Sequence, residues 1–128
     1  MTKIRLHEIV AFDNYEVISI ESGHVVVSTV VSKQSLNVYG NAHGGFLFTL
    51  CDQISGMTVM STGFDAVTLQ SNVNYLKGAK EGDTLTIEGQ MIHNGRTTKV
   101  VEVTITNKAQ QLVTRGSFTM FVIGQHDD

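Results

Sequence analysis

The sequence predicts an α+β protein in which an antiparallel sheet of five to six strands, most simply six, wraps around one long buried helix. Two observations predict this fold. Six segments are rich in β-branched residues or alternate between apolar and polar side chains, as strands do. A single further segment has apolar side chains at helical spacing and almost no charge. One helix is fully buried by such a sheet only if the sheet curls around it or a second copy covers it, so a dimer is expected.

The predicted strands fall before and after the helix. Residues 16–32 are rich in Val and Ile and are broken once, at Ser22-Gly23, which predicts two strands joined by a tight turn. Four more segments alternate at period two: 66–77, 84–92, 98–106 and 112–123. In the segment 66–77 the core face is expected to carry Val67, Leu69, Val73 and Tyr75, and the polar face Thr68, Gln70, Asn72 and Asn74.

The predicted helix spans residues 42–63 and follows a loop, 35–45, that contains three glycines and two asparagines. Apolar residues surround the helix, so we expect it to be buried on most sides. Asp52 is its only acidic or basic side chain apart from His43. A surface helix would carry several charges, so a lone carboxylate here marks a candidate catalytic residue. Cys51 is expected to be core, because no paired base marks it as a nucleophile.

Composition limits the classes of protein. The 128 residues fit one domain, placed at 15–124, with an N-terminal segment 1–14 and a tail 125–128. The net charge of −3 and the absence of a Lys/Arg run argue against a nucleic-acid partner. No apolar run approaches membrane-spanning length, and no secretory signal follows Met1, so a cytoplasmic protein is expected. The histidines are scattered, and no metal or cofactor is predicted.

One motif joins the loop to the helix. Asn37 is followed six residues later by His43-Gly44-Gly45, and Asp52 comes nine residues after the histidine. A helix N-terminus presents unpaired N–H groups, and glycines let a substrate oxygen approach them, which predicts an oxyanion hole. Asp52 lies too far along the same helix to serve the same carbonyl, since each residue rises about 1.5 Å. We therefore expect a partner subunit to supply one of the two groups.

This motif resembles the signature of the PaaI-like and thioesterase superfamily member 2-like hot-dog thioesterases. The similarity extends through Asn72–Leu76, Gly82-Asp83, His93–Thr97 and Thr106–Ala109, and covers roughly residues 15–123. The resemblance implies a hot-dog fold and hydrolysis of an acyl-CoA, arylacetyl or fatty, without a cofactor. It also implies a homodimer at minimum, with a homotetramer of two such dimers expected.

The resemblance also implies roles for individual residues. Asp52 would be the general base or nucleophile, and the Gly44 amide would polarise the thioester carbonyl of a site shared between subunits. His43 and Asn37 would hold the thioester or the water, and Thr68 would position the water. The residues expected to bind substrate or CoA are Gly45, Gln70, Tyr75, Lys77, Gly78, Lys80, His93, Asn94, Gly95, Arg96 and Thr97.

Two rival functions use the same scaffold. The first is a catalytically idle protein that binds acyl-CoA or another metabolite, and the presence of every catalytic position argues against it. The second is a dehydratase of hydroxyacyl thioesters, whose relatives carry a Pro-containing loop before the helix, whereas this chain has no proline. Release of a free thiol from acyl-CoA would distinguish hydrolysis from binding, and an enoyl product would favour the dehydratase.

Overall fold

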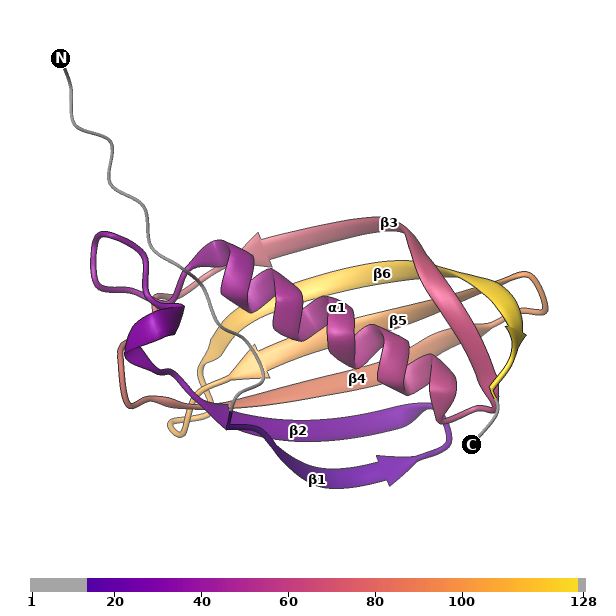
Figure 1. The fold of residues 1–128 in the computed structure, drawn as a ribbon, viewed down its shortest axis with the longest axis horizontal. Helices are drawn as coiled ribbons and strands as arrows, with labels where there is room; N and C mark the ends of the chain where they lie inside the picture. The colour runs from indigo at the N-terminus through magenta and orange to yellow at the C-terminus, as the bar shows by residue number, and fades with distance from the viewer. Residues whose placement is uncertain (1–13, 127–128) are drawn as a thin grey trace, which may run out of the picture.

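The computed structural model describes residues 14–126, so most of the predicted N-terminal segment and part of the tail lie outside the described residues. Its elements are β1 (Glu16–Glu21), β2 (His24–Val30), the short 3-10 helix η1 (Lys33–Ser35), α1 (Gly44–Met60), β3 (Phe64–Tyr75), β4 (Thr84–Asn94), β5 (Thr98–Thr106) and β6 (Leu112–Gln125). The six strands form one sheet in the order β1-β2-β4-β5-β6-β3, and all neighbours are antiparallel. Figure 1 shows α1 lying along one face of this sheet, with β1 and β3 at its edges. The predicted fold class is confirmed.

The core lies between α1 and the sheet. Apolar side chains of the helix, such as Leu50 and Ile54, are buried against Val27, Ile87 and Val103 of the strands. The buried hydroxyls of Ser55 and Thr58 donate to the carbonyls of Cys51 and Ile54 one turn earlier, so burial leaves them satisfied. The helix is buried or half-buried on most sides in the single chain, as predicted, and one face with Gly45, Thr49, Gln53 and Met60 is exposed.

Strand β3 departs from strict alternation, and this corrects the predicted faces. Thr68 pairs with Met120 of β6 and Gln70 pairs with Thr119, so Leu69 between them is a β-bulge. One extra residue reverses which side chains face the helix. Val67 and Leu69, expected in the core, are 51% and 62% exposed, whereas Thr68 faces the helix. Beyond the bulge, Val73 packs against the core as expected, whereas Tyr75, also expected in the core, is 49% exposed.

Hydrogen bonds join the start of α1 to two loops. The His43 N–H donates to the Ser35 carbonyl at 2.8 Å, and the Ala42 N–H donates to the Ala79 carbonyl at 2.7 Å. Ala79 is buried in the loop 76–83 that links β3 to β4. The end of β3 and this loop are therefore held beside the helix N-terminus. Among residues 14–126, no helix combines the length and the apolar character needed to cross a membrane.

Candidate active site

His43 caps α1 and thereby decides which backbone donors stay free. Its backbone is extended (φ −65°, ψ 139°), and its Nδ1 accepts the Gly45 N–H at 2.8 Å. An accepting Nδ1 requires a neutral ring with the proton on Nε2. The Gly45 N–H, predicted to face substrate, is thus already engaged. The Gly44 N–H has no hydrogen-bond partner within residues 14–126, so it is the donor available to a ligand.

Gly44 opens onto a hollow beside the end of β3. The Tyr75 ring lies 3.8 Å from where a Cβ on Gly44 would stand. Burial, and secondarily the neighbouring Cys51, raise the pKa of Tyr75, so its hydroxyl stays protonated at neutral pH. The hollow has a volume of about 370 Å³ and is lined by Ala42, Gly44, Leu47, Tyr75, Leu76, Lys77 and Gly78. A backbone donor, a hydroxyl and the Lys77 segment therefore border one space.

Asn37 shapes the loop before the helix. Its Oδ1 accepts the N–H groups of Tyr39 at 2.9 Å and Asn41 at 3.1 Å. The amide oxygen is consequently used inside the loop, which leaves only the Nδ2 group for the predicted role toward thioester or water. The same loop packs on Gly78, because a Cβ there would lie 3.3 Å from the Asn41 Oδ1.

Asp52 and Thr68 form the second part of the candidate site. Asp52 is half-buried on α1, and the Thr68 Oγ1 donates to its Oδ1 at 2.5 Å. The bulge at Leu69 turns the Thr68 hydroxyl toward the helix and makes this bond possible. The pair borders a hollow of about 380 Å³, lined by Asp52, Gln53, Gly56, Met60, Ala66, Val67, Thr68 and Met120.

One chain does not bring the two parts together. Gly44 and Asp52 are eight residues apart on a straight helix, about 12 Å along its axis. The two hollows share no lining residue. A carbonyl bound at the Gly44 N–H is therefore beyond the reach of the Asp52 carboxylate of the same chain, as the sequence spacing predicts.

The predicted CoA-binding residues are also divided. Tyr75, Lys77, Gly78 and Lys80 lie at the helix N-terminus, whereas His93, Asn94, Gly95, Arg96 and Thr97 lie at the β4–β5 turn. The 11 residues of β4 separate these groups by about 33 Å, and Figure 1 shows them at opposite ends of the sheet. The Lys80 N–H donates to Asp83, and Gln70 on β3 donates to the Ser71 carbonyl at 3.2 Å. A single chain does not assemble these residues into one site.

A family model described as the thioesterase superfamily matches residues 39–114 of this chain. The chain belongs to the thioesterase superfamily. The matched range contains the His43–Gly45 turn, Asp52 and Thr68. The predicted family is thus confirmed, and with it the enzyme class of hydrolases that act on thioester bonds.

Individual relatives support this membership. The acyl-coenzyme A thioesterase PaaI of Escherichia coli K12 is 36% identical over 98 residues, which cover 77% of this chain and 70% of PaaI. A hypothetical thioesterase of Streptococcus pneumoniae TIGR4, solved with coenzyme A, is 56% identical with a TM-score of 0.95, covering 97% of this chain and 100% of that one. That protein was also solved as the mutants Thr68→Ala and Asp52→Ala in its own numbering. A Streptococcus mutans UA159 protein bound to acetyl-CoA is 60% identical with a TM-score of 0.89, covering 97% and 100%.

The structural role of Lys99 in this thioesterase superfamily member was not predicted from the sequence. Lys99 is 3% exposed, lies 4.6 Å above the Phe64 ring, and donates to the Asn94 Oδ1 and, at 3.1 Å, to the Gly95 carbonyl. It fixes the β4–β5 turn, so Asn94 and Gly95 have structural partners inside the chain. The signal was present in the sequence, because alternation puts Lys99 on the same face as Val101 and Val103.

Cys51 does not contribute a nucleophile in the thioesterase. Its side chain is fully buried, and burial, with a smaller contribution from Asp52, raises the pKa of the thiol to about 12. The reactive thiolate is therefore not populated at neutral pH. This agrees with the predicted core role.

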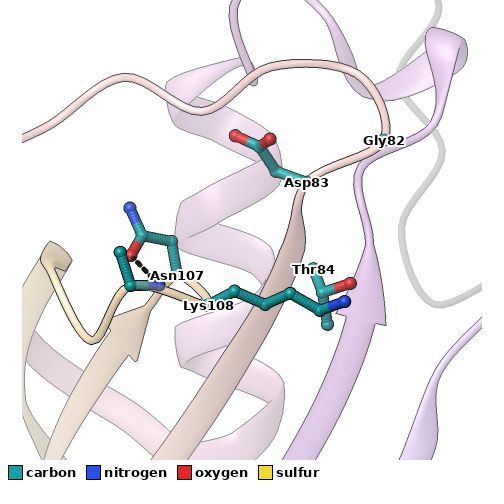
Figure 2. Close-up of a pocket in the computed structure, with 6 residues that line it drawn as sticks. Gly82, Asp83, Thr84, Asn107 and Lys108 are labelled. Atoms are coloured by element: carbon teal, nitrogen blue, oxygen red, sulfur yellow. Dashed lines mark hydrogen bonds between the residues drawn. The ribbon is translucent and has the colours of Figure 1, made fainter.

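Another hollow, of about 270 Å³, lies between the turns before β4 and before β6 and is drawn in Figure 2. Two of its polar side chains form hydrogen bonds within those turns: Asp83 accepts the Lys80 N–H, and the Asn107 Oδ1 accepts the Ala109 N–H. Within residues 14–126, no three His, Cys, Asp or Glu side chains gather closely enough to hold a metal ion.

Proposed function

We propose that this chain hydrolyses acyl-CoA thioesters to a free acid and CoA. The observation that carries the proposal is the 2.5 Å hydrogen bond from Thr68 to Asp52 beside an open hollow. A carboxylate held in this way can take a proton from water. The relatives support the same chemistry, since two solved relatives hold CoA or acetyl-CoA, and one was mutated at an Asp52 and a Thr68.

In the proposed reaction, Asp52 removes a proton from a water molecule that Thr68 positions. The water oxygen bonds to the thioester carbon, and the negative charge on the carbonyl oxygen is stabilised by the Gly44 N–H. The C–S bond then breaks, and the proton taken from water passes to the leaving CoA thiolate. Asp52 as nucleophile is the alternative route to the same products. It would form an acyl anhydride with the carboxylate, and attack of ¹⁸O-water on the Asp52 carbon of that anhydride in one turnover would leave the label on Asp52 rather than in the acid.

We propose that the active site forms between two subunits. Two features support a dimer: the open face of α1, and the edge strand β3 with its exposed Val67 and Leu69. An exposed apolar edge strand is suited to pairing with a second copy. A two-fold axis there would make the helices antiparallel and direct the Gly44 of one chain toward the Asp52 of the other.

The same symmetry would unite the divided CoA residues. The segment Tyr75–Lys80 of one subunit would approach the turn His93–Thr97 of the other, since the two lie at opposite ends of one chain. Lys77, Lys80 and Arg96 would then supply positive charge for the CoA phosphates. The tetramer, the cytoplasmic location and the arylacetyl or fatty acyl group stay predictions.

The test is release of free thiol from acetyl-, octanoyl- and phenylacetyl-CoA by wild type and by Asp52→Asn. Loss of the base is expected to lower kcat by about 10² to 10⁴-fold. Circular dichroism and sedimentation should show the variant folded and in the wild-type oligomeric state. Full activity of Asp52→Asn would refute the mechanism. Binding of acyl-CoA by wild type without thiol release would instead identify a binding protein.

A further inference from the structure

Gly56 occupies a position in α1 where the chain itself gives no packing reason for a glycine. It lies one turn beyond Asp52 and one turn before Met60, on the same helix face. A Cβ built on Gly56 would meet no atom within 4 Å. Gly89 differs, because a Cβ there would collide with Thr58 and Ile54. Glycine inside a helix lowers helix stability relative to alanine, so the absence of a side chain at Gly56 lowers the stability of α1.

The open space belongs to the hollow beside the Asp52–Thr68 pair. Gly56 lines this hollow together with Met60, Ala66, Val67 and Met120. Asp52 is the only ionisable group in its lining. At about 380 Å³ the hollow falls within the size range of small-molecule pockets. An uncharged apolar group would fit this lining, whereas a second carboxylate would meet apolar side chains and the charge of Asp52.

We propose that Gly56 determines acyl-chain specificity, because the missing side chain gives an uncharged acyl group longer than acetyl room beside Asp52. This inference rests on the proposed acyl-CoA hydrolysis. A thioester carbonyl attacked by water at Asp52 and Thr68 places its acyl carbons next to these two residues, and they border the hollow directly. A side chain at position 56 would extend into the same space. It would shorten the acyl groups that the site accepts.

The experiment compares Gly56→Ala and Gly56→Leu with Gly124→Leu. A Cβ on Gly124 would also meet no atom within 4 Å, but Gly124 lies on β6 outside the hollow, so it controls for the substitution itself. The measured quantity is the ratio of kcat/KM for octanoyl-CoA to that for acetyl-CoA. Gly56→Leu is expected to lower this ratio at least about tenfold, Gly56→Ala less, and Gly124→Leu not at all.

Three outcomes would overturn the inference. An unchanged ratio in both Gly56 variants would show that the acyl group lies elsewhere. Dissociation of both Gly56 variants in sedimentation would show that Gly56 serves the approach of a partner helix instead. A wild type that already prefers acetyl-CoA over octanoyl-CoA would leave no long acyl group to accommodate. Absence of any thiol release by wild type would instead refute the proposed function itself. The three outcomes above all require an active wild type, so the two kinds of failure are distinguishable.

Discussion

The hydrogen bond between Thr68 and Asp52 depends on the β-bulge at Leu69. Without the bulge at Leu69, strict alternation along β3 would not allow Thr68 and Val73 to share the helix-facing side. The hydroxyl then reaches the carboxylate at 2.5 Å and also lies 3.6 Å from the Met120 sulfur. The group that orients Asp52 is therefore set by strand geometry rather than by proximity in sequence.

The role of the Thr68 hydroxyl is testable with a near-isosteric change. Thr68→Val keeps the shape but removes the donor, and a hydrogen bond to a charged group contributes about 1.5–3 kcal/mol. We expect kcat to fall roughly 10- to 100-fold. Thr68→Ser keeps the hydroxyl and should retain most of the rate. Steady-state kinetics check this, and equal rates for the Val and Ser variants would contradict it.

Cys51 gives a prediction about stability at high pH. Its pKa is about 12 in the folded chain, against about 8.5 for a free thiol, so between these values the unfolded state binds fewer protons. Stability should therefore fall as pH rises, by up to about 1.4 kcal/mol per pH unit. Urea unfolding at pH 8 and pH 10 should show a larger loss for wild type than for Cys51→Ala. Identical losses would show that the thiol makes no contribution.

At the scale of the elements, α1 lies close against the sheet at Gly89 of β4. A Cβ there would overlap the Thr58 Oγ1 and lie 2.9 Å from the Ile54 Cγ2. Thr58 and Ile54 are both fully buried, so neither has space to move aside. The absence of a side chain at Gly89 thus sets the height of the helix above the strands.

We expect Gly89→Ala to destabilise the protein by about 1–3 kcal/mol, because the added methyl group overpacks the interface between α1 and β4. Chemical denaturation measures the change. Gly124→Ala, where the added carbon meets nothing within 4 Å, is the matched control and should be close to neutral. A neutral Gly89→Ala would mean that the helix shifts freely on the sheet.

At the scale of the whole molecule, the proposed mechanism requires Gly44 and Asp52 of two different chains to act on one substrate. Gly44→Pro removes the proposed donor while keeping a residue that suits the first helical position. His43 is already extended, as the residue before proline prefers. The change therefore deletes one N–H group with little expected disturbance of the helix.

Mixing subunits tests the shared site. Asp52→Asn and Gly44→Pro should each be inactive alone. A heterodimer of the two has one site with Asp52 and Gly44 both intact, so random mixing after refolding should restore about a quarter of wild-type activity. Thiol release from the mixture measures this. A mixture as inactive as its parents would contradict a site built from two subunits.

Much of the fold follows from local sequence patterns. Alternation and β-branched residues located the strands to within a few residues, and the uncharged segment located α1. The tight turn at Ser22-Gly23 was also predicted, and Gly23 has a positive φ of 80°, which glycine adopts without steric cost. These features depend on neighbours in the chain, so the sequence carries them directly.

The sequence by itself determined the six strands, the single helix and the His43-Gly44-Gly45 and Asp52 motif at its start and middle. Only the tertiary structure decided that Thr68 faces Asp52, because a bulge depends on the register between β3 and β6. It also decided that His43 occupies the Gly45 N–H and leaves the Gly44 N–H free. Strand register and helix capping depend on specific contacts between groups in the folded chain, and local periodicity does not specify those contacts.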